Sequence, residues 1–228
     1  MGRSAADDMI LSYGDVVLRR SDLGILSGPR FLNDRIIEFY FSFLSSTQPS
    51  QDILLVPPSI AFWLANCPNP ESLEEFAAPL GLKDKKLVIF PVNDNADVNL
   101  AEGGSHWSLL AYYRDANVFV HHDSLRSMNR RGALQLYKAV VGLVTDPDTA
   151  AHTKYMESTD SPRQLNGYDC GLYVTATARA IYNWYESREE KGKVGSWISA
   201  VKEQVTPTAV ENMRSEILEL IRGLMTSQ

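Results

Sequence analysis

A nearly continuous apolar segment in the middle of the chain constrains the fold more than any other feature. It runs from Leu87 to Val92, within a predicted strand at residues 86–93. A strand that is apolar on both faces has to be covered on both faces, as the central strands of a buried sheet are. The longest apolar runs in the chain, this segment among them, are far shorter than a membrane-spanning helix requires. We therefore expect a buried central strand and no membrane span.

Strand and helix patterns on both sides of this segment predict an α+β fold. Two further strands are expected at residues 106–113 and 118–122, joined by a hairpin turn at 114–117. A polar, glycine-ended loop at residues 94–104 precedes them. Apolar residues at helical spacing, bounded by helix-start and helix-stop residues, predict the helices. These cover residues 33–44, 57–66, 70 to about 81, 129–144, 170–184 and 207–225.

The length predicts a single domain. A chain of 228 residues suits one domain and is long enough to bury a substantial core. Residues 191–195 are predicted to be a linker, which is too short a break to indicate a second domain. We therefore expect one domain over residues 1–228, with C-terminal helices between residues 194 and 225.

Charge and cysteine content exclude several classes of protein. The net charge is −6, and nucleic-acid binding favours a basic surface, so nucleic acid is not an expected partner. Two cysteines without a Cys-x-x-Cys motif support neither a disulfide scaffold nor a cysteine-rich zinc site. The first eight residues are polar and acidic, unlike a signal peptide. We expect a reduced protein of the cytoplasm, with the nucleus as the alternative location.

Cys170 is the first candidate for chemistry. Polar and glycine residues precede it and an apolar helical pattern follows, which places Cys170 at a helix N-terminus. The free backbone amides and partial positive charge there favour the thiolate and can donate to an oxyanion. A small buried cysteine is the alternative, and it is the commoner fate of the residue. Cys67 has no recognisable base near it in the sequence and is expected only to pack.

His106 and Asp123 are predicted to be neighbours. His106 begins one strand of the expected hairpin and Asp123 follows the end of the other, so the hairpin brings them together. A carboxylate in that place orients an imidazole and stabilises its cation, as in cysteine and serine triads. A metal site is disfavoured, because the adjacent His121 and His122 point to opposite faces of a strand and no metal-binding spacing occurs.

Four sequence motifs together resemble those of the ubiquitin-like-protein-specific cysteine proteases, the family of SUMO and Nedd proteases. The motifs are Phe31–Asp34, Gly103–Leu110, His122–Ser124 and Gln164–Val174, with the cysteine last, unlike the papain order. The chain looks most like the compact deneddylase (sentrin-specific protease 8-like) branch. The likeness covers about residues 11 to 185. It implies a papain-like cysteine protease fold of the ubiquitin-like-protease type, with a small mixed sheet flanked by helices.

The resemblance implies a role for each candidate residue. Cys170 would be the nucleophile, His106 the general base, Asp123 its orienting partner and Gln164 an oxyanion donor. Trp107 and Phe31, where the family usually has tryptophan, would line a tunnel for a Gly-Gly tail, with plain core packing as the alternative. Asp34 would bind a basic residue of the tail, or alternatively cap a helix. The segment that begins at Asn93 and continues to Gly104 would close over the modifier.

The function implied is cleavage after the C-terminal Gly-Gly of a Nedd/RUB modifier, in precursor processing and in deneddylation of targets such as cullins. No cofactor or metal is expected, and a monomer is expected. The alternatives are a SUMO protease, a deubiquitinase or an acetyltransferase with the same residues, and a catalytically silent adaptor that binds the modifier. The complete set of catalytic residue types argues against the adaptor.

Overall fold

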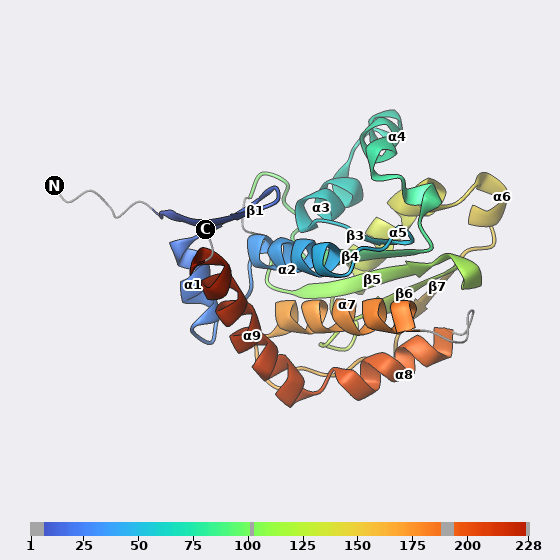
Figure 1. Ribbon diagram of the computed structural model, residues 1–228. Helices are drawn as coiled ribbons and strands as arrows, with labels where there is room; N and C mark the ends of the chain where they lie inside the picture. The colour runs from blue at the N-terminus through green and yellow to red at the C-terminus, as the bar shows by residue number, and fades with distance from the viewer. Residues whose placement is uncertain (1–6, 101–102, 188–193, 227–228) are drawn as a thin grey trace.

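A five-stranded mixed sheet forms the centre of the protein (Figure 1). The computed structural model describes residues 7–100, 103–187 and 194–226. Strands β4, β5 and β6 pair antiparallel, whereas β3 and β7 pair in parallel with β4 and β6. This arrangement confirms the expected α+β class with a small mixed sheet. In sheet order the strands are β3 (Ile53–Leu55), β4 (Leu87–Asn93), β5 (Trp107–Tyr113), β6 (Val118–His122) and β7 (Lys154–Glu157).

Helices cover both faces of the sheet, with α3 and α5 on one side and α7 and α8 on the other (Figure 1). A separate antiparallel hairpin, β1 (Met9–Tyr13) and β2 (Val16–Arg19), precedes them. In the described part of the chain, no helix has the length and apolar character that a membrane crossing needs. The helices are α1 (Arg20–Leu26), α2 (Asp34–Thr47), α3 (Pro58–Asn66), α4 (Pro70–Ala77), α5 (Arg130–Val144), α6 (Pro147–Ala150), α7 (Cys170–Ser187), α8 (Val194–Gln204) and α9 (Pro207–Thr226).

Two separate apolar cores explain the continuous apolar segment. Leu87 and Ile89 of β4 point into the core that contains side chains of α2, α7, α8 and α9. Val88 and Phe90 point into the opposite core, with side chains of α3 and α5. Successive side chains of a strand alternate between its faces, so a strand with a core on each side is apolar at every position. The predicted buried central strand is confirmed.

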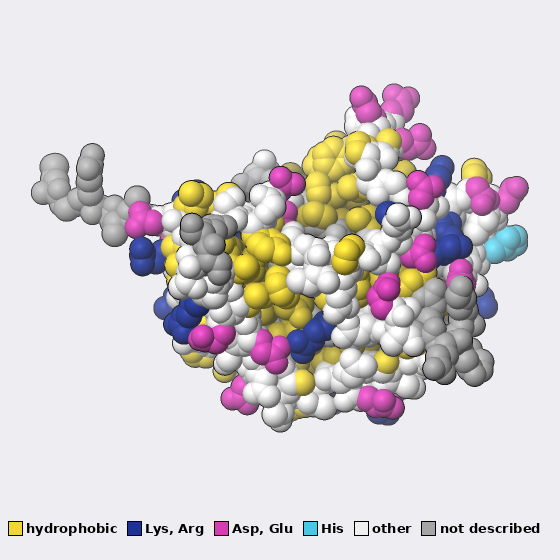
Figure 2. Space-filling model, in the orientation of Figure 1, with side chains coloured by type: hydrophobic (Ala, Val, Ile, Leu, Met, Phe, Trp, Pro, Cys, Tyr) yellow, Lys and Arg dark blue, Asp and Glu magenta, His cyan; other side chains and the backbone are white. Residues whose placement is uncertain are grey.

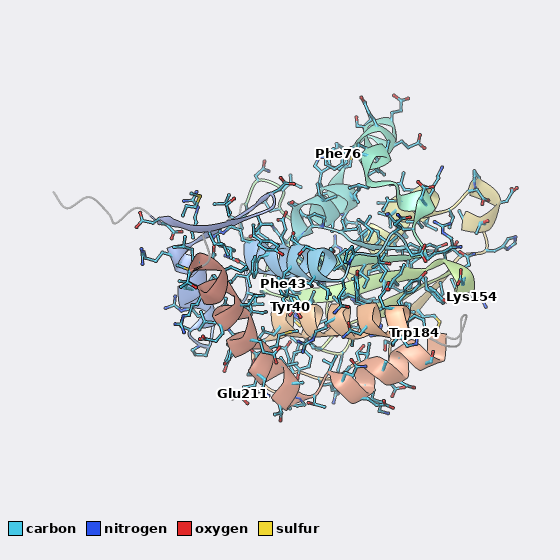
Figure 3. All side chains as sticks on the ribbon, in the orientation of Figure 1. Tyr40, Phe43, Phe76, Lys154, Trp184 and Glu211 are labelled. Carbon is cyan, nitrogen blue, oxygen red and sulfur yellow. The ribbon has the colours of Figure 1, made fainter. Side chains whose placement is uncertain are left out.

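Aromatic side chains from several helices meet in the larger core. Trp184 of α7 packs edge-on against Tyr113 of β5 and against Trp197 of α8. Figure 3 labels Trp184 and, on α2, Tyr40, which belongs to the same core. Such contacts hold the C-terminal helices against the sheet, because large aromatic side chains bury much apolar area and favour edge-to-face packing.

Exposed carboxylates account for part of the negative charge. Glu71, Glu74 and Glu75 on α4 are exposed, and Figure 2 shows acidic side chains gathered at the tip of this helix. An exposed acidic tip favours solubility.

The predicted helices and hairpin agree with the structure to within a few residues, and the differences are informative. The second predicted strand begins at Trp107 rather than at residue 106. The predicted linker at residues 191–195 ends too late, because helix α8 already begins at Val194. Residues 191–193 of that prediction lie outside the described part of the chain. The hairpin β1–β2, helix α1 and the short edge strands β3 and β7 were not predicted. Both edge strands pair with residues distant in the sequence.

Candidate active site

Cys170 is the first residue of α7, as the sequence predicts, and its side chain is buried. The carbonyl of Asp169 accepts the amide of Tyr173 at 3.0 Å, which begins the helix. The next residue is glycine for a steric reason: a Cβ on Gly171 would lie 2.7 Å from the Cβ of Leu32. Cys170 therefore combines a helix N-terminus with close contact to the segment that precedes α2.

His106 and Asp123 are in contact, as the hairpin predicts. The distance between His106 Nε2 and Asp123 Oδ1 is 2.6 Å, and both side chains are buried. His106 comes directly before β5 and Asp123 directly after β6, where the register pairs Leu109 with His122. The antiparallel ladder thus places both side chains at one end of the sheet.

Backbone amides hold the Asp123 carboxylate in its charged form. Asp123 Oδ1 also accepts the amide of Leu125 at 2.7 Å, and Oδ2 accepts the amide of Asn129 at 2.8 Å. Burial raises the pKa of Asp123, but the hydrogen bonds from His106 and these amides outweigh burial and lower it. Asp123 is therefore a fixed negative charge beside the imidazole.

His106 carries the opposite charge through the same interaction. Burial lowers the pKa of His106, but its interactions with Asp123 and with the Cys170 side chain outweigh burial and raise it to about 9. Nδ1 of His106 is buried and has no conventional hydrogen-bond partner in the described part of the chain. Because Asp123 occupies Nε2, Nδ1 is the nitrogen left to face the Cys170 sulfur. The arrangement favours an imidazolium between a carboxylate and a thiol.

Asp94, which the sequence analysis did not single out, positions the backbone of His106. Its Oδ1 accepts the amides of Ser105 at 2.6 Å and His106 at 2.9 Å, and its own amide donates to the carbonyl of His106. Asn93 ends β4, and its Oδ1 accepts the amide of Asn95 at 2.8 Å. Gly104 has φ +87° and lies so close to the Asn93 side chain that a Cβ would overlap it. The base of the 94–104 loop is thereby tied to the start of β5.

Gln164 lies in the loop before Cys170 and is buried. Its Oε1 accepts the Ser124 hydroxyl at 2.7 Å, and its Nε2 donates to the carbonyl of Asn166 at 2.7 Å. Ser124 comes directly after Asp123, so this contact connects the loop to the end of β6. Nε2 carries two hydrogens, and the bond to Asn166 uses one of them.

The aromatic residues of the predicted tunnel lie on neighbouring segments. Trp107 Nε1 donates to the carbonyl of Leu32 at 3.0 Å, which ties β5 to the residue after Phe31. Phe31 is 49% exposed, so core packing does not explain it. The N-cap of α2 is Asn33, whose Oδ1 accepts the amide of Ile36. Asp34 is the first helical residue rather than the N-cap, but its Oδ1 accepts the amide of Arg35 at 2.9 Å, so it also contributes to the helix start.

His121 and His122 point to opposite faces of β6, as predicted. His121 contacts Glu157 and Ser108, while His122 contacts Ser161 and accepts from Trp197 Nε1 at 3.1 Å. No group of side chains able to hold a metal ion occurs among the described residues.

Asn129 is a further site residue that local sequence patterns did not single out. Its amide holds Asp123, while its side-chain Nδ2 donates to the carbonyl of Val92 at 2.9 Å and to the Ser108 hydroxyl at 3.0 Å. In the sequence, Asn129 stood out only as the first residue of the helix predicted at residues 129–144. Its function in the site depends on contacts with β4 and β5 that carry no local signal.

Comparison with known proteins gives concordant results. Residues 30–190 match the Ulp1 protease family, C-terminal catalytic domain. The NEDD8-specific protease 1 of Arabidopsis thaliana is 56% identical over 226 residues, covering 99% of this chain and 98% of that protein. Human sentrin-specific protease 8 is 33% identical over 225 residues, covering 96% and 98%.

The fold is also similar to solved structures. The C-terminal Ulp1 protease domain in complex with Smt3, the yeast ortholog of SUMO, superposes with a TM-score of 0.67 at 17% identity, covering 95% of this chain and 88% of that one. At this identity the likeness concerns the fold, and it agrees with the mixed sheet and flanking helices described above.

Proposed function

Because the chain belongs to the Ulp1 protease family, we propose that it is a cysteine protease that cleaves after the C-terminal Gly-Gly of a NEDD8-type modifier. The observation that carries the proposal is the buried line of Cys170, His106 and Asp123, with the cysteine at a helix N-terminus. The NEDD8-specific protease 1 of Arabidopsis thaliana matches nearly the whole chain at 56% identity, which favours this modifier over SUMO or ubiquitin.

The proposed reaction begins with a Cys170 thiolate beside the His106 imidazolium. The thiolate attacks the carbonyl carbon of the terminal glycine and forms a tetrahedral intermediate. The Cys170 amide and the second N–H of Gln164 Nε2 stabilise the oxyanion. His106 then gives its proton to the leaving amine, which departs and leaves a thioester. Neutral His106 then takes a proton from a water molecule, whose oxygen attacks the thioester. The carboxylic acid of the modifier is released, and the Cys170 thiolate and His106 imidazolium are regenerated. No step requires a cofactor.

The tail of the modifier is proposed to pass between Trp107 and Phe31. Leu32 links the two, because its carbonyl accepts from Trp107 and its side chain packs on Gly171 beside Cys170. A narrow passage between aromatic side chains excludes residues with bulky side chains and so selects Gly-Gly. Asp34, half-buried at the start of α2, is proposed to bind a basic residue of the tail. Asn93 and the loop that follows it are proposed to close over the modifier.

Substrates are proposed to be modifier precursors and modified targets such as cullins. The protein is proposed to act as a monomer, in a reducing compartment such as the cytoplasm, because a reactive thiolate is open to oxidation.

Three activity-based probes would test this proposal: NEDD8, SUMO and ubiquitin, each ending in a vinyl sulfone. We expect covalent labelling by the NEDD8 probe, loss of labelling in Cys170→Ala and normal labelling in Cys67→Ala. Cys67 is the matched control because it is the other free cysteine and donates only to the Asn69 carbonyl. Labelling by the SUMO or ubiquitin probe alone would reassign the modifier. Binding of NEDD8 without any labelling would indicate an adaptor.

A further inference from the structure

Arg214 of α9 joins two segments that flank Cys170, although it lies outside the residues that match the family. Its Nη1 donates to the carbonyls of Ile25 and Gly28, each at 3.0 Å. Its Nη2 donates to the carbonyl of Arg30 at 2.9 Å and to Asp169 Oδ1 at 2.7 Å. The side chain is only 14% exposed. Figure 1 shows α9 running from α8 toward α1, and Glu211, labelled in Figure 3, marks the turn before Arg214.

One arm of this contact continues to the proposed oxyanion donor. Asp169 Oδ2 accepts Asn166 Nδ2 at 2.6 Å, and the carbonyl of Asn166 accepts Gln164 Nε2 at 2.7 Å. Gln164 in turn accepts the hydroxyl of Ser124 at 2.7 Å. A chain of hydrogen bonds therefore leads from α9, through the residue before Cys170, to the side chain that faces the reacting carbonyl.

The other arm reaches the segment that leads into the proposed tunnel. The carbonyls of Ile25, Gly28 and Arg30 belong to the end of α1 and to the loop that follows it. Phe31 follows directly, and the carbonyl of Leu32 accepts from Trp107. Arg214 thus connects the loop before Phe31 with the loop before Cys170.

We propose that Arg214 is a positioning residue for catalysis. Its guanidinium fixes the position of the loop 164–169, which contains the proposed oxyanion donor, relative to residues 25–30, which lead directly into Phe31. This inference rests on the proposed function. Only arginine suits the position, because its planar group has five donors in a fixed arrangement, whereas lysine is a point charge with three rotating donors. The guanidinium also lies over the Tyr168 ring, 5.7 Å from its centroid, which supports the same loop.

The test compares Arg214→Met with a matched control on the same helix. Glu216→Gln removes a different ion pair between α9 and α7, the one from Arg179 Nη1 to Glu216 Oε2 at 2.8 Å, and does not touch either loop. With a fluorogenic NEDD8 C-terminal amide, we expect kcat of Arg214→Met to fall by about 10- to 100-fold, below the full loss of an oxyanion donor. Its KM should rise, because the tunnel wall is released. Glu216→Gln should stay within about twofold of the wild type for both constants, since it is an exposed pair.

The alkylation rate of Cys170 distinguishes misplacement of the oxyanion donor from a general loosening of the active site. Alkylation of Cys170 by iodoacetamide needs the thiolate but no oxyanion donor, so its rate in Arg214→Met should stay within about twofold of the wild type. Equal losses in alkylation and in kcat, or an unchanged kcat, would overturn the proposal.

A second variant covers the case in which Arg214→Met does not fold. Asp169→Asn keeps the shape of the side chain but removes its charge, and it should lower kcat in the same direction by a smaller factor. An unchanged kcat in Asp169→Asn would contradict the inference. Where Arg214→Met folds, the two effects in the double variant should be less than additive, because both act through one contact; fully additive effects would also contradict it.

Hydrogen exchange tests the connection without reference to turnover. Arg214→Met should expose the amides of residues 25–30 and 164–169 while exchange in β4 and β5 stays unchanged. If none of the three modifier probes labels the wild-type protein, the proposed function is refuted. The exchange pattern would still decide whether Arg214 connects the two loops. Unchanged exchange in both loops would refute the connection.

Discussion

His106 and His122 are both buried imidazoles at the same end of the sheet, yet their pKa values move in opposite directions. Burial lowers the pKa of both, because it disfavours the charged form. Asp123 and Cys170 outweigh burial at His106 and raise its pKa to about 9. At His122 burial prevails, helped by the neighbouring His121, and its pKa falls to about 3. His106 has a carboxylate and a thiol in contact to offset burial, whereas His122 has no anionic side chain in hydrogen-bond contact among the described residues.

The partners follow from strand geometry. Asp123 is adjacent to His122 in the sequence, but it contacts His106 across the hairpin. His122 Nε2 instead accepts from the indole of Trp197, which uses the lone pair that a proton would need. His122, on one face of β6, is therefore held as a neutral imidazole. His106 is held as a cation by Asp123, the residue that follows β6. The first suits a core contact and the second suits acid–base chemistry.

Removing the carboxylate should have the largest effect on this contrast. Asp123→Asn leaves His106 with burial and without its anionic partner, so the pKa of His106 should fall from about 9. We expect kcat to fall by roughly 10³-fold or more, as for loss of the orienting carboxylate in a triad. Alkylation of Cys170 by iodoacetamide at neutral pH should slow as well. Asp148→Asn, an exposed carboxylate on α6, is the control. Unchanged alkylation would contradict an ion pair that depends on Asp123.

The pH dependence of activity should show the same contrast. Because His106 has a raised pKa, kcat/KM should decline as the pH rises through about 9 and the imidazolium is lost. The stabilisation that His106 gives to the fold has the same sign: it is complete below pH about 6.5 and is lost as the pH rises through about 9. Measurement of kcat/KM from pH 6 to 10 checks this, with His122→Gln expected to keep the same decline. A profile that stays flat to pH 10 would argue against a cationic His106.

The smallest expected effect concerns acid stability. The pKa of His122 is lowered, so its contribution to the fold is present above pH about 6.5 and is lost progressively as the pH falls toward about 3. His122→Gln cannot titrate and still offers an acceptor to Trp197. The wild type should therefore lose unfolding free energy relative to the variant as the pH falls through that window.

Urea unfolding between pH 7 and 4 measures this difference, with the exposed His152→Gln as the control. A difference that does not change with pH would mean that His122 is not held neutral.

Local patterns predicted most of the fold and the positions of Cys170, His106 and Asp123. The position of Cys170 followed from the change between a polar glycine-containing segment and an apolar helical one. The contact between His106 and Asp123 followed from a short hairpin, and the opposed side chains of His121 and His122 followed from the two-residue period of a strand. Each of these signals lies within a few neighbouring residues.

The supporting contacts had no such signal. Arg214 meets Asp169, 45 positions earlier, and Trp197 meets His122, 75 positions earlier. Strand β7 has only four residues and pairs in parallel with β6 after α5 and α6 intervene. Such contacts depend on how the folded helices and strands pack against one another, and they cannot be predicted from the spacing of residues in the sequence.

Local patterns were thus sufficient to place Cys170 at a helix start and His106 beside Asp123, because a helix start and a hairpin are short-range structures. Packing of α8 and α9 against the rest decided what the chain alone left open. It made one histidine a neutral core residue, and it brought an arginine near the C-terminus to the loop that precedes Cys170. Charge states and loop positions depend on the whole surroundings of a side chain, and those surroundings exist only in the folded protein.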